Sequence, residues 1–370
     1  MIRLAFVGCG AVTEEEHLPA LQGLPGVSVV AAVDPRPERL RKICDRFQIP
    51  RRYAHVDALA RDAQVDAVGI CVPAGSYGQV VPPLLAAGKH LLVEKPPGLA
   101  LDDVDQMIAW ARRGRAKVMV GYHMRWHRLV RQAKAVIDAG VLGELESIRA
   151  VWYGPRDDTD LPPWRERRAL GGGALIETAV DHFDLWRFLL ASDVAEIFAR
   201  SRPGRRDDEA AVVSAVFDNG VLGSAVFSER TAEDIEFEVC GAAGRLRVSC
   251  VRVEGLAFYP AGGNPASLMA RARRIPEVLR ALPTGMRNLW TGGDFRSSYR
   301  HQWSHFLDAL RTDGPVGCTL EDGRAALQTA LAAVESATEG RSVRIKQAER
   351  HLIATGRGAA GQPSPAPASP

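Results

Sequence analysis

The first 122 residues alternate short apolar runs with amphipathic helical patterns, and this alternation constrains the fold more than any other feature. The runs are nearly continuous in Val, Leu, Ile and Ala, as expected of parallel strands buried on both faces. The pattern predicts right-handed βαβ units and a doubly wound α/β domain. The predicted strands are Arg3–Gly8, Val27–Asp34, Val65–Val72, His90–Glu94 and Lys117–Tyr122, and the helices between them are His17–Leu24, Pro37–Phe47, Tyr77–Ala87 and Asp102–Arg113.

The pattern changes after Tyr122, which we take as the end of the first domain (residues 1–122). The stretch VVSAVF-DNG-VLGSAVF predicts a β-hairpin that turns at Asp218–Gly220. A strand-rich stretch with a few helices predicts a second, α+β domain over residues 123–346, with an open, mostly antiparallel sheet. Its other predicted elements are helices at Arg128–Ala139, from Ala174, at Arg300–Leu310 and at Leu320–Glu339, and strands at Glu144–Tyr153, Ile235–Cys240 and Arg245–Val253. Residues 347–370 form a Pro/Ala-rich tail that we expect not to pack.

Length and composition narrow the class of protein. The 370 residues are enough for two domains, and 47 Lys and Arg against 44 Asp and Glu give no reason to expect nucleic acid or an anionic membrane as partner. The six cysteines lie far apart without CxxC or Cys/His spacing, so we expect reduced thiols and no metal site. No signal peptide precedes the first strand and no apolar run is long enough for a bilayer, so we expect a cytoplasmic protein.

The end of the first strand, AFVGCGAVT, predicts a dinucleotide-binding turn. Gly8 and Gly10 allow a tight turn and close approach to a pyrophosphate, and the next helix begins with free N–H groups, including those of Ala11 and Val12. The third glycine of the usual G-x-G-x-x-G pattern is replaced by Thr13.

Asp34 ends the second strand, where an acidic side chain accepts hydrogen bonds from the adenosine ribose. A carboxylate there repels a 2′-phosphate, so NAD is favoured over NADP, although Arg36 softens this preference. The alternative is that Asp34 only caps the turn before Pro35.

The segment GGGALIETAVDH carries an unusual group of ionisable side chains on a predicted helix. On a regular α-helix Glu177 and Asp181 differ by about 40° and share one face, whereas His182 lies about 140° from Glu177. Two carboxylates at this spacing repel unless one holds a proton or a cation lies between them. Such a pair suits an active site, where a carboxylate with a raised pKa takes a proton near neutral pH.

With EKP at Glu94–Pro96, the sequence resembles the Gfo/Idh/MocA oxidoreductases over nearly its whole length. The resemblance rests on GCGAV, VDAVGICVPAG, AAGKHLLVEKP, VGYHMRWH, LGELESIRAV, GGGALIE and HFLDALR…TLEDGRAAL…VESATEGRSV. It implies a Rossmann domain followed by an open-faced α/β domain, with NAD across the strand ends and a polyhydroxylated substrate beside it. It also implies a homodimer or homotetramer formed through the open sheet.

The resemblance also implies site residues. Lys95 would lie beside the nicotinamide and bind the reacting oxygen, while Asp181 stands where the family has a histidine. We expect Lys95, Glu177 and Asp181 to be catalytic, and either carboxylate to be the base. The remaining cofactor contacts are expected at Val72, Pro73, Ala74 and Glu94, and substrate contacts at Tyr77, His123, Arg125, Tyr153, Trp164, Arg165 and His182. Tyr77 stands where many relatives have histidine, and Asp184 is expected to act structurally.

Three functions fit these features. The first is an NAD-dependent oxidoreductase that interconverts a secondary alcohol and a ketone on a sugar, cyclitol or nucleotide-sugar. The second is a redox-neutral enzyme that retains NAD for epimerisation, elimination or glycoside hydrolysis. The third is a catalytically silent NAD or ligand sensor, in which Asp181 marks a lost base, because fold and cofactor motifs do not by themselves establish chemistry.

Overall fold

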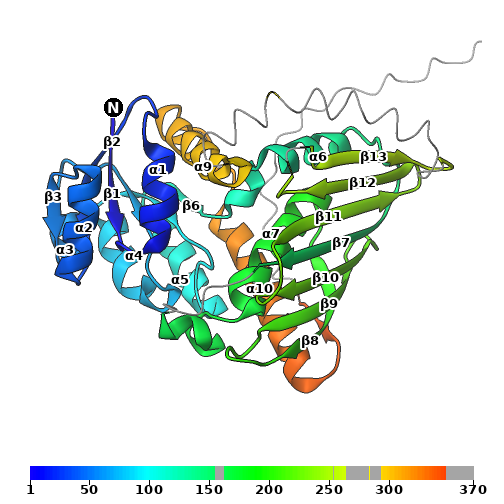
Figure 1. Ribbon diagram of the computed structural model, residues 1–370. Helices are drawn as coiled ribbons and strands as arrows, with labels where there is room; N and C mark the ends of the chain where they lie inside the picture. Colours follow the sequence, from blue (N-terminus) through cyan, green and yellow to red (C-terminus); the bar gives the residue numbers. More distant parts are fainter. Residues whose placement is uncertain (155–161, 253, 264–282, 284–292, 347–370) are drawn as a thin grey trace, which may run out of the picture.

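The computed structural model describes residues 1–154, 162–252, 254–263, 283 and 293–346, which form two sheets (Figure 1). The first sheet has six parallel strands in the order β3-β2-β1-β4-β5-β6. This is the order of a Rossmann sheet, whose direction of winding reverses between β1 and β4. The strands are β1 (Ile2–Val7), β2 (Val27–Val33), β3 (Arg51–Tyr53), β4 (Ala67–Ile70), β5 (His90–Val93) and β6 (Val118–Val120).

All five strands predicted in this domain are confirmed, whereas β3 was missed. Its sequence, RRY, is short and charged, as is common for an edge strand, and it lacks the apolar run that marked the others. The predicted helix at His17–Leu24 is instead a π-helix, η1 (Thr13–His17), followed by α1 (Leu18–Leu21). The other helices of this domain are α2 (Pro37–Phe47), α3 (Val56–Ala60), α4 (Tyr77–Ala86) and α5 (Leu101–Arg112).

The second sheet has eight strands in the order β13-β12-β11-β7-β10-β9-β8-β14. Its neighbours are antiparallel except for β7 and β10, which pair in parallel. The predicted hairpin is confirmed, with Val216 opposite Leu222 and Gly220 at a φ of 83° in the turn. The strands are β7 (Leu145–Tyr153), β8 (Val194–Arg202), β9 (Ala210–Phe217), β10 (Leu222–Ser228), β11 (Asp234–Gly241), β12 (Gly244–Ser249), β13 (Leu256–Pro260) and β14 (Val343–Arg344).

Late helices connect the two sheets, which lie at opposite sides of the molecule in Figure 1. Helix α10 contacts α5 and β6 of the first domain as well as α7 and β8 of the second. Helix α9 packs beside α1, and its Trp303 ring lies 5.7 Å from the Phe6 ring, at a place where Gly69 leaves room. The larger helices of this half are α6 (Arg128–Asp138), α7 (Ala179–Leu190), α9 (Gly293–Arg311) and α10 (Leu320–Glu339).

Some predictions concern segments outside the described residues. These are the predicted tail 347–370 and residues 155–161, which fall in the loop expected to line a substrate pocket. The domain boundary at Tyr122 stays a prediction, although the chain does leave the first sheet there. Among the described helices, none combines the length and the apolar character needed to cross a membrane.

Candidate active site

The turn after β1 is shaped for close backbone contact. Gly8 has a φ of 96°, and a Cβ there would lie 2.3 Å from the Cys71 carbonyl oxygen, so glycine is required. Thr13 is fully buried and its hydroxyl donates to the Gly8 carbonyl at 2.7 Å, which closes the turn without the third glycine. A Cβ on Gly10 would meet nothing within 4 Å. The space before Gly10 and the helix that starts there fit the pyrophosphate of a dinucleotide.

Asp34 lies directly after β2 and is 7% exposed. Its Oδ2 accepts from the Cys9 N–H at 2.8 Å and its Oδ1 from the Arg36 N–H at 2.9 Å. The carboxylate therefore does cap its own turn, and it also holds the glycine turn against β2. Each oxygen keeps a further lone pair, so the prediction that Asp34 accepts from a ribose is compatible with this role.

Lys95, just after β5, and Asp181, on α7, form an ion pair in which the aspartate is buried and the lysine is partly exposed. The Lys95 Nζ lies 2.7 Å from Asp181 Oδ2 and donates to the Glu177 carbonyl oxygen at 2.8 Å. Asp181 is 2% exposed, and its Oδ1 has no hydrogen-bond partner in the described part of the chain. Burial raises the pKa of Asp181 to about 6, although the Lys95 ammonium opposes the shift. An aspartate in this state exchanges a proton near neutral pH.

The expectation that Glu177 aims its carboxylate at Lys95 was wrong. Glu177 Oε1 lies 3.0 Å from Arg165 Nε, and only the backbone carbonyl of Glu177 contacts the lysine. The reason is local: the segment Ala174–Thr178 (η6) is a π-helix, so the 100° per residue of an α-helix does not apply there. Gly172 permits this arrangement, because a Cβ there would lie 2.1 Å from the Arg165 carbonyl.

Two predicted substrate contacts, Tyr77 and His123, belong to the packed interior. Tyr77 is 2% exposed and its hydroxyl donates to the Glu94 carbonyl at 2.6 Å. The His123 ring stacks on Tyr299 with centroids 4.2 Å apart, and its Nδ1 lies 2.7 Å from Ser298 Oγ. Burial, together with the Lys95 charge, places the pKa of His123 well below its usual range. Both side chains are buried, so they pack beneath the surface of the candidate site and do not line it.

His182 likewise lies in the core, where it is 1% exposed. Its ring packs edge-on against Trp152 and Phe227, and neither ring nitrogen has a hydrogen-bond partner among the described residues. Burial lowers the pKa of His182 to about 3. The expectation that His182 binds substrate is therefore not supported by its position.

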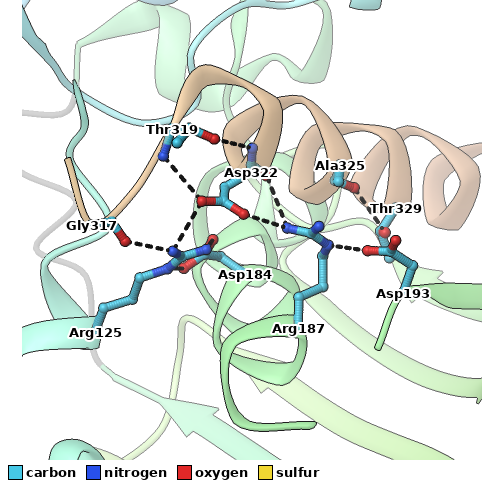
Figure 2. Close-up of polar contacts among 9 residues, drawn as sticks. All are labelled: Arg125, Asp184, Arg187, Asp193, Gly317, Thr319, Asp322, Ala325 and Thr329. Carbon is cyan, nitrogen blue, oxygen red and sulfur yellow. Dashed lines mark hydrogen bonds and ion pairs between the residues drawn. The ribbon is translucent and has the colours of Figure 1, made fainter. Parts of the chain in front are cut away.

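Arg125 was expected to bind substrate, but its guanidinium is committed to a buried network (Figure 2). Its Nε and Nη2 donate to the two oxygens of Asp184 at 2.7 and 2.6 Å, and its Nη1 donates to Asp322 Oδ2 at 3.2 Å. Arg187 continues the network from Asp322 to Asp193. Because Asp184 is on α7 and Asp322 on α10, the network fixes the helix that carries Asp181. The structural role expected for Asp184 has this basis.

Three predicted substrate residues stay at accessible positions. Arg165 lies over the Trp164 ring at 5.2 Å, and both residues are partly exposed beside Glu177. Tyr153 is partly exposed at the end of β7, opposite Asp234. The loop residues Val72, Pro73 and Ala74 are likewise partly or fully exposed next to the Gly8 turn.

The contact between His17 and Glu94 was not predicted from the sequence. Glu94 is 7% exposed, its Oε1 lies 3.0 Å from His17 Nε2, and its Oε2 accepts from the Lys95 N–H at 3.3 Å. Gly121 makes this possible, because a Cβ there would lie 2.6 Å from Glu94 Oε1. His17 ends the acidic segment Thr13–His17 just before Leu18–Leu21, so no pattern marked it as a partner of Glu94.

The Rossmann sheet, the glycine turn and the acidic end of β2 are typical of an NAD-binding protein, and the Lys95–Asp181 pair at its edge supplies groups suited to proton transfer. Residues 2–122 match the model of the oxidoreductase family with an NAD-binding Rossmann fold, and residues 130–247 match the GFO/IDH/MocA C-terminal domain. The chain belongs to the Gfo/Idh/MocA family, and it is an NAD-dependent oxidoreductase.

Named relatives span almost the whole chain. Myo-inositol 2-dehydrogenase of Thermotoga maritima is 26% identical over 94% of this chain and 99% of its own length. The 1,5-anhydro-D-fructose reductase of Ensifer adhaerens is 28% identical over 94% and 99%. The fold is also that of the WlbA dehydrogenase of Bordetella pertussis, solved with NADH and UDP-GlcNAcA, with a TM-score of 0.79 at 19% identity and coverage of 94% and 98%.

Proposed function

We propose that this enzyme interconverts a secondary alcohol and a ketone on a sugar, cyclitol or nucleotide-sugar-like ring, with Lys95 and Asp181 handling the hydroxyl proton. The observation that carries the proposal is the ion pair between Lys95 and the buried Asp181, in which Lys95 Nζ lies 2.7 Å from Asp181 Oδ2. An ammonium beside a carboxylate with a raised pKa suits a reaction that must remove a proton from a hydroxyl as hydride leaves the carbon.

NAD, held by the Gly8–Gly10 turn and Asp34, supplies the hydride acceptor when bound. Lys95 donates a hydrogen bond to the substrate oxygen, and its charge stabilises the negative charge that develops there. The hydroxyl proton passes to Asp181, because its pKa is raised and its Oδ1 has no hydrogen-bond partner among the described residues. In the opposite direction the same carboxyl returns the proton to the carbonyl oxygen.

Asp181 is a better candidate for the base than Glu177. The Glu177 carboxylate pairs with Arg165, and Lys95 reaches only its carbonyl. We therefore assign Glu177 to positioning: its carbonyl orients the ammonium, while its carboxylate orients the exposed Arg165 toward the space where a polyhydroxylated ring would bind. The names of the relatives, dehydrogenases and reductases, favour net oxidation or reduction over the redox-neutral alternative.

The test is turnover by the purified enzyme with NAD and a panel of inositols, aldoses, anhydrosugars and nucleotide-sugars. Absorbance at 340 nm should rise with at least one substrate, and Lys95→Met should lower kcat at least a hundredfold while the Kd for NAD changes little. Product formed without a change at 340 nm would instead support a redox-neutral reaction. NAD binding without turnover on the whole panel would support a sensor.

A further inference from the structure

Glu94 contacts His17, which in turn contacts Trp303. Neither His17 nor Trp303 has a role in the proposed reaction. His17 belongs to the π-helix η1, and Trp303 belongs to α9, which follows in the chain 286 residues later. Both side chains are fully buried. The Trp303 Nε1 lies 3.0 Å from His17 Nδ1, and His17 Nε2 lies 3.0 Å from Glu94 Oε1.

The hydrogen bond from the Trp303 indole determines which ring nitrogen of His17 carries the proton. An indole N–H is only a donor, so His17 Nδ1 must present a lone pair to Trp303. The ring proton then lies on Nε2 and is donated to Glu94. Burial opposes the imidazolium while Cys71 and Glu94 favour it and carry the pKa of His17 upward to about 10. An imidazolium would, however, face the Trp303 N–H with a second N–H, so the hydrogen bonds require the neutral ring.

The His17 ring is packed among three aromatic rings. Its ring lies against Phe6 at 5.9 Å, Tyr299 at 5.1 Å and Trp303 at 5.7 Å between centroids, and Tyr299 and Trp303 meet it edge-on. A neutral histidine also leaves the Glu94 charge intact. This matters because Glu94 is one of the charges that act on Asp181.

We propose that Trp303 and His17 are positioning residues: the indole selects the Nε2–H tautomer of His17, which holds the Glu94 carboxylate against the Lys95 backbone and so places the Lys95 ammonium. This inference rests on the proposed function of Lys95. It makes α9, a helix from the end of the chain, a determinant of catalysis in the first domain.

The tautomer is read by nuclear magnetic resonance of the full chain labelled with ¹⁵N-histidine, without added NAD, at pH 7.5. The signal missing from His17→Gln identifies His17, and we expect the neutral Nε2–H pattern. An imidazolium or an Nδ1–H pattern would overturn the proposal. This readout does not involve Lys95, so turnover that survives Lys95→Met would refute the proposed function and leave the tautomer result intact.

Kinetics then separate positioning from packing. Trp303→Phe should lower kcat about tenfold with a nearly unchanged KM, as expected for the loss of one hydrogen bond. Trp186→Phe is the matched control, because the buried Trp186 N–H has no hydrogen-bond partner among the described residues. His17→Gln retains a donor for Glu94 and should keep most of the kcat that His17→Leu loses. If Gln is no better than Leu, although both variants show the parent's circular dichroism, the role assigned to His17 is wrong.

Discussion

The proton acceptor sets the pH dependence of turnover. Burial raises the pKa of Asp181 to about 6, Lys95 opposes the shift, and Glu94 and Asp184 add to it. A base with this pKa is ionised in only about one molecule in ten at pH 5. We therefore expect kcat/KM for alcohol oxidation, which reports the pKa values of the free enzyme, to be level above pH 7, to halve near pH 6 and to fall about tenfold per unit below pH 5.

The assay is the initial rate of NADH formation between pH 4.5 and 9 at substrate concentrations well below KM, with folding checked at each pH. Asp181→Asn should lower kcat by about a hundredfold to ten-thousandfold and remove the acid limb. Glu177→Gln is the control, because it retains the carbonyl that orients Lys95 and should keep the limb. An acid limb that survives Asp181→Asn, or disappears only in Glu177→Gln, would refute the assignment of Asp181.

The same pKa shift has a consequence for stability. The folded pKa of Asp181, about 6, lies above its ordinary value of 3.8, so folding favours the protonated carboxyl. This contribution is fully present below about pH 4 and is lost as pH rises through 6. A shift of about two units corresponds to roughly 3 kcal/mol. The stability of Asp181→Asn relative to the parent should therefore improve by up to about 3 kcal/mol from pH 4 to pH 8 in urea unfolding.

Three further predictions test the framework around this site. Arg125→Met should lower the free energy of unfolding by about 3–5 kcal/mol, because it leaves Asp184 charged and buried. Adding Asp184→Leu should restore part of that loss. If Arg125→Met unfolds in urea like the parent, Arg125 does not stabilise the fold through this network. Gly10→Ala should keep the parent's stability yet weaken NAD binding at least tenfold by calorimetry. Gly8→Ala should instead lose about 1–3 kcal/mol of stability from backbone strain. Unchanged NAD affinity in Gly10→Ala would show that the pyrophosphate does not bind at this turn. Asp34→Ala should reduce the preference for NAD over NADP at least tenfold in competition binding, and an unchanged ratio would contradict its contact with ribose.

The fold was predictable because its determinants are local. Buried parallel strands leave continuous apolar runs, and the hairpin turn at Gly220 needs a positive φ, so both are visible in the sequence. The edge strand β3 was missed because a three-residue strand has no periodicity to detect. Helix α9 begins at Gly293, whereas the predicted helix began at Arg300. The prediction missed the first turns of α9 because they lack an apolar pattern.

The site was predictable only where regular geometry held. The Asp181 carboxylate meets Lys95, but the Glu177 carboxylate pairs with Arg165 instead, because Glu177 lies in the π-helical segment η6. Nothing in the sequence marks η6 or η1 as π-helical. The contact between His17 and Trp303 joins residues 286 apart, and a pattern in one segment carries no information on such a pair.

An aspartate can replace the family's histidine because the environment, rather than the residue type, sets the working pKa. Burial disfavours the charged form of any group, so it moves imidazoles and carboxylates in opposite directions. On this same helix burial lowers the pKa of His182 to about 3 and raises that of Asp181 to about 6. A histidine at 181 would also face the Lys95 ammonium, which lowers its pKa further, whereas the aspartate pairs with it. Asp181 is 2% exposed and lies 2.7 Å from the Lys95 ammonium, and in these surroundings a carboxylate can still exchange a proton near neutral pH.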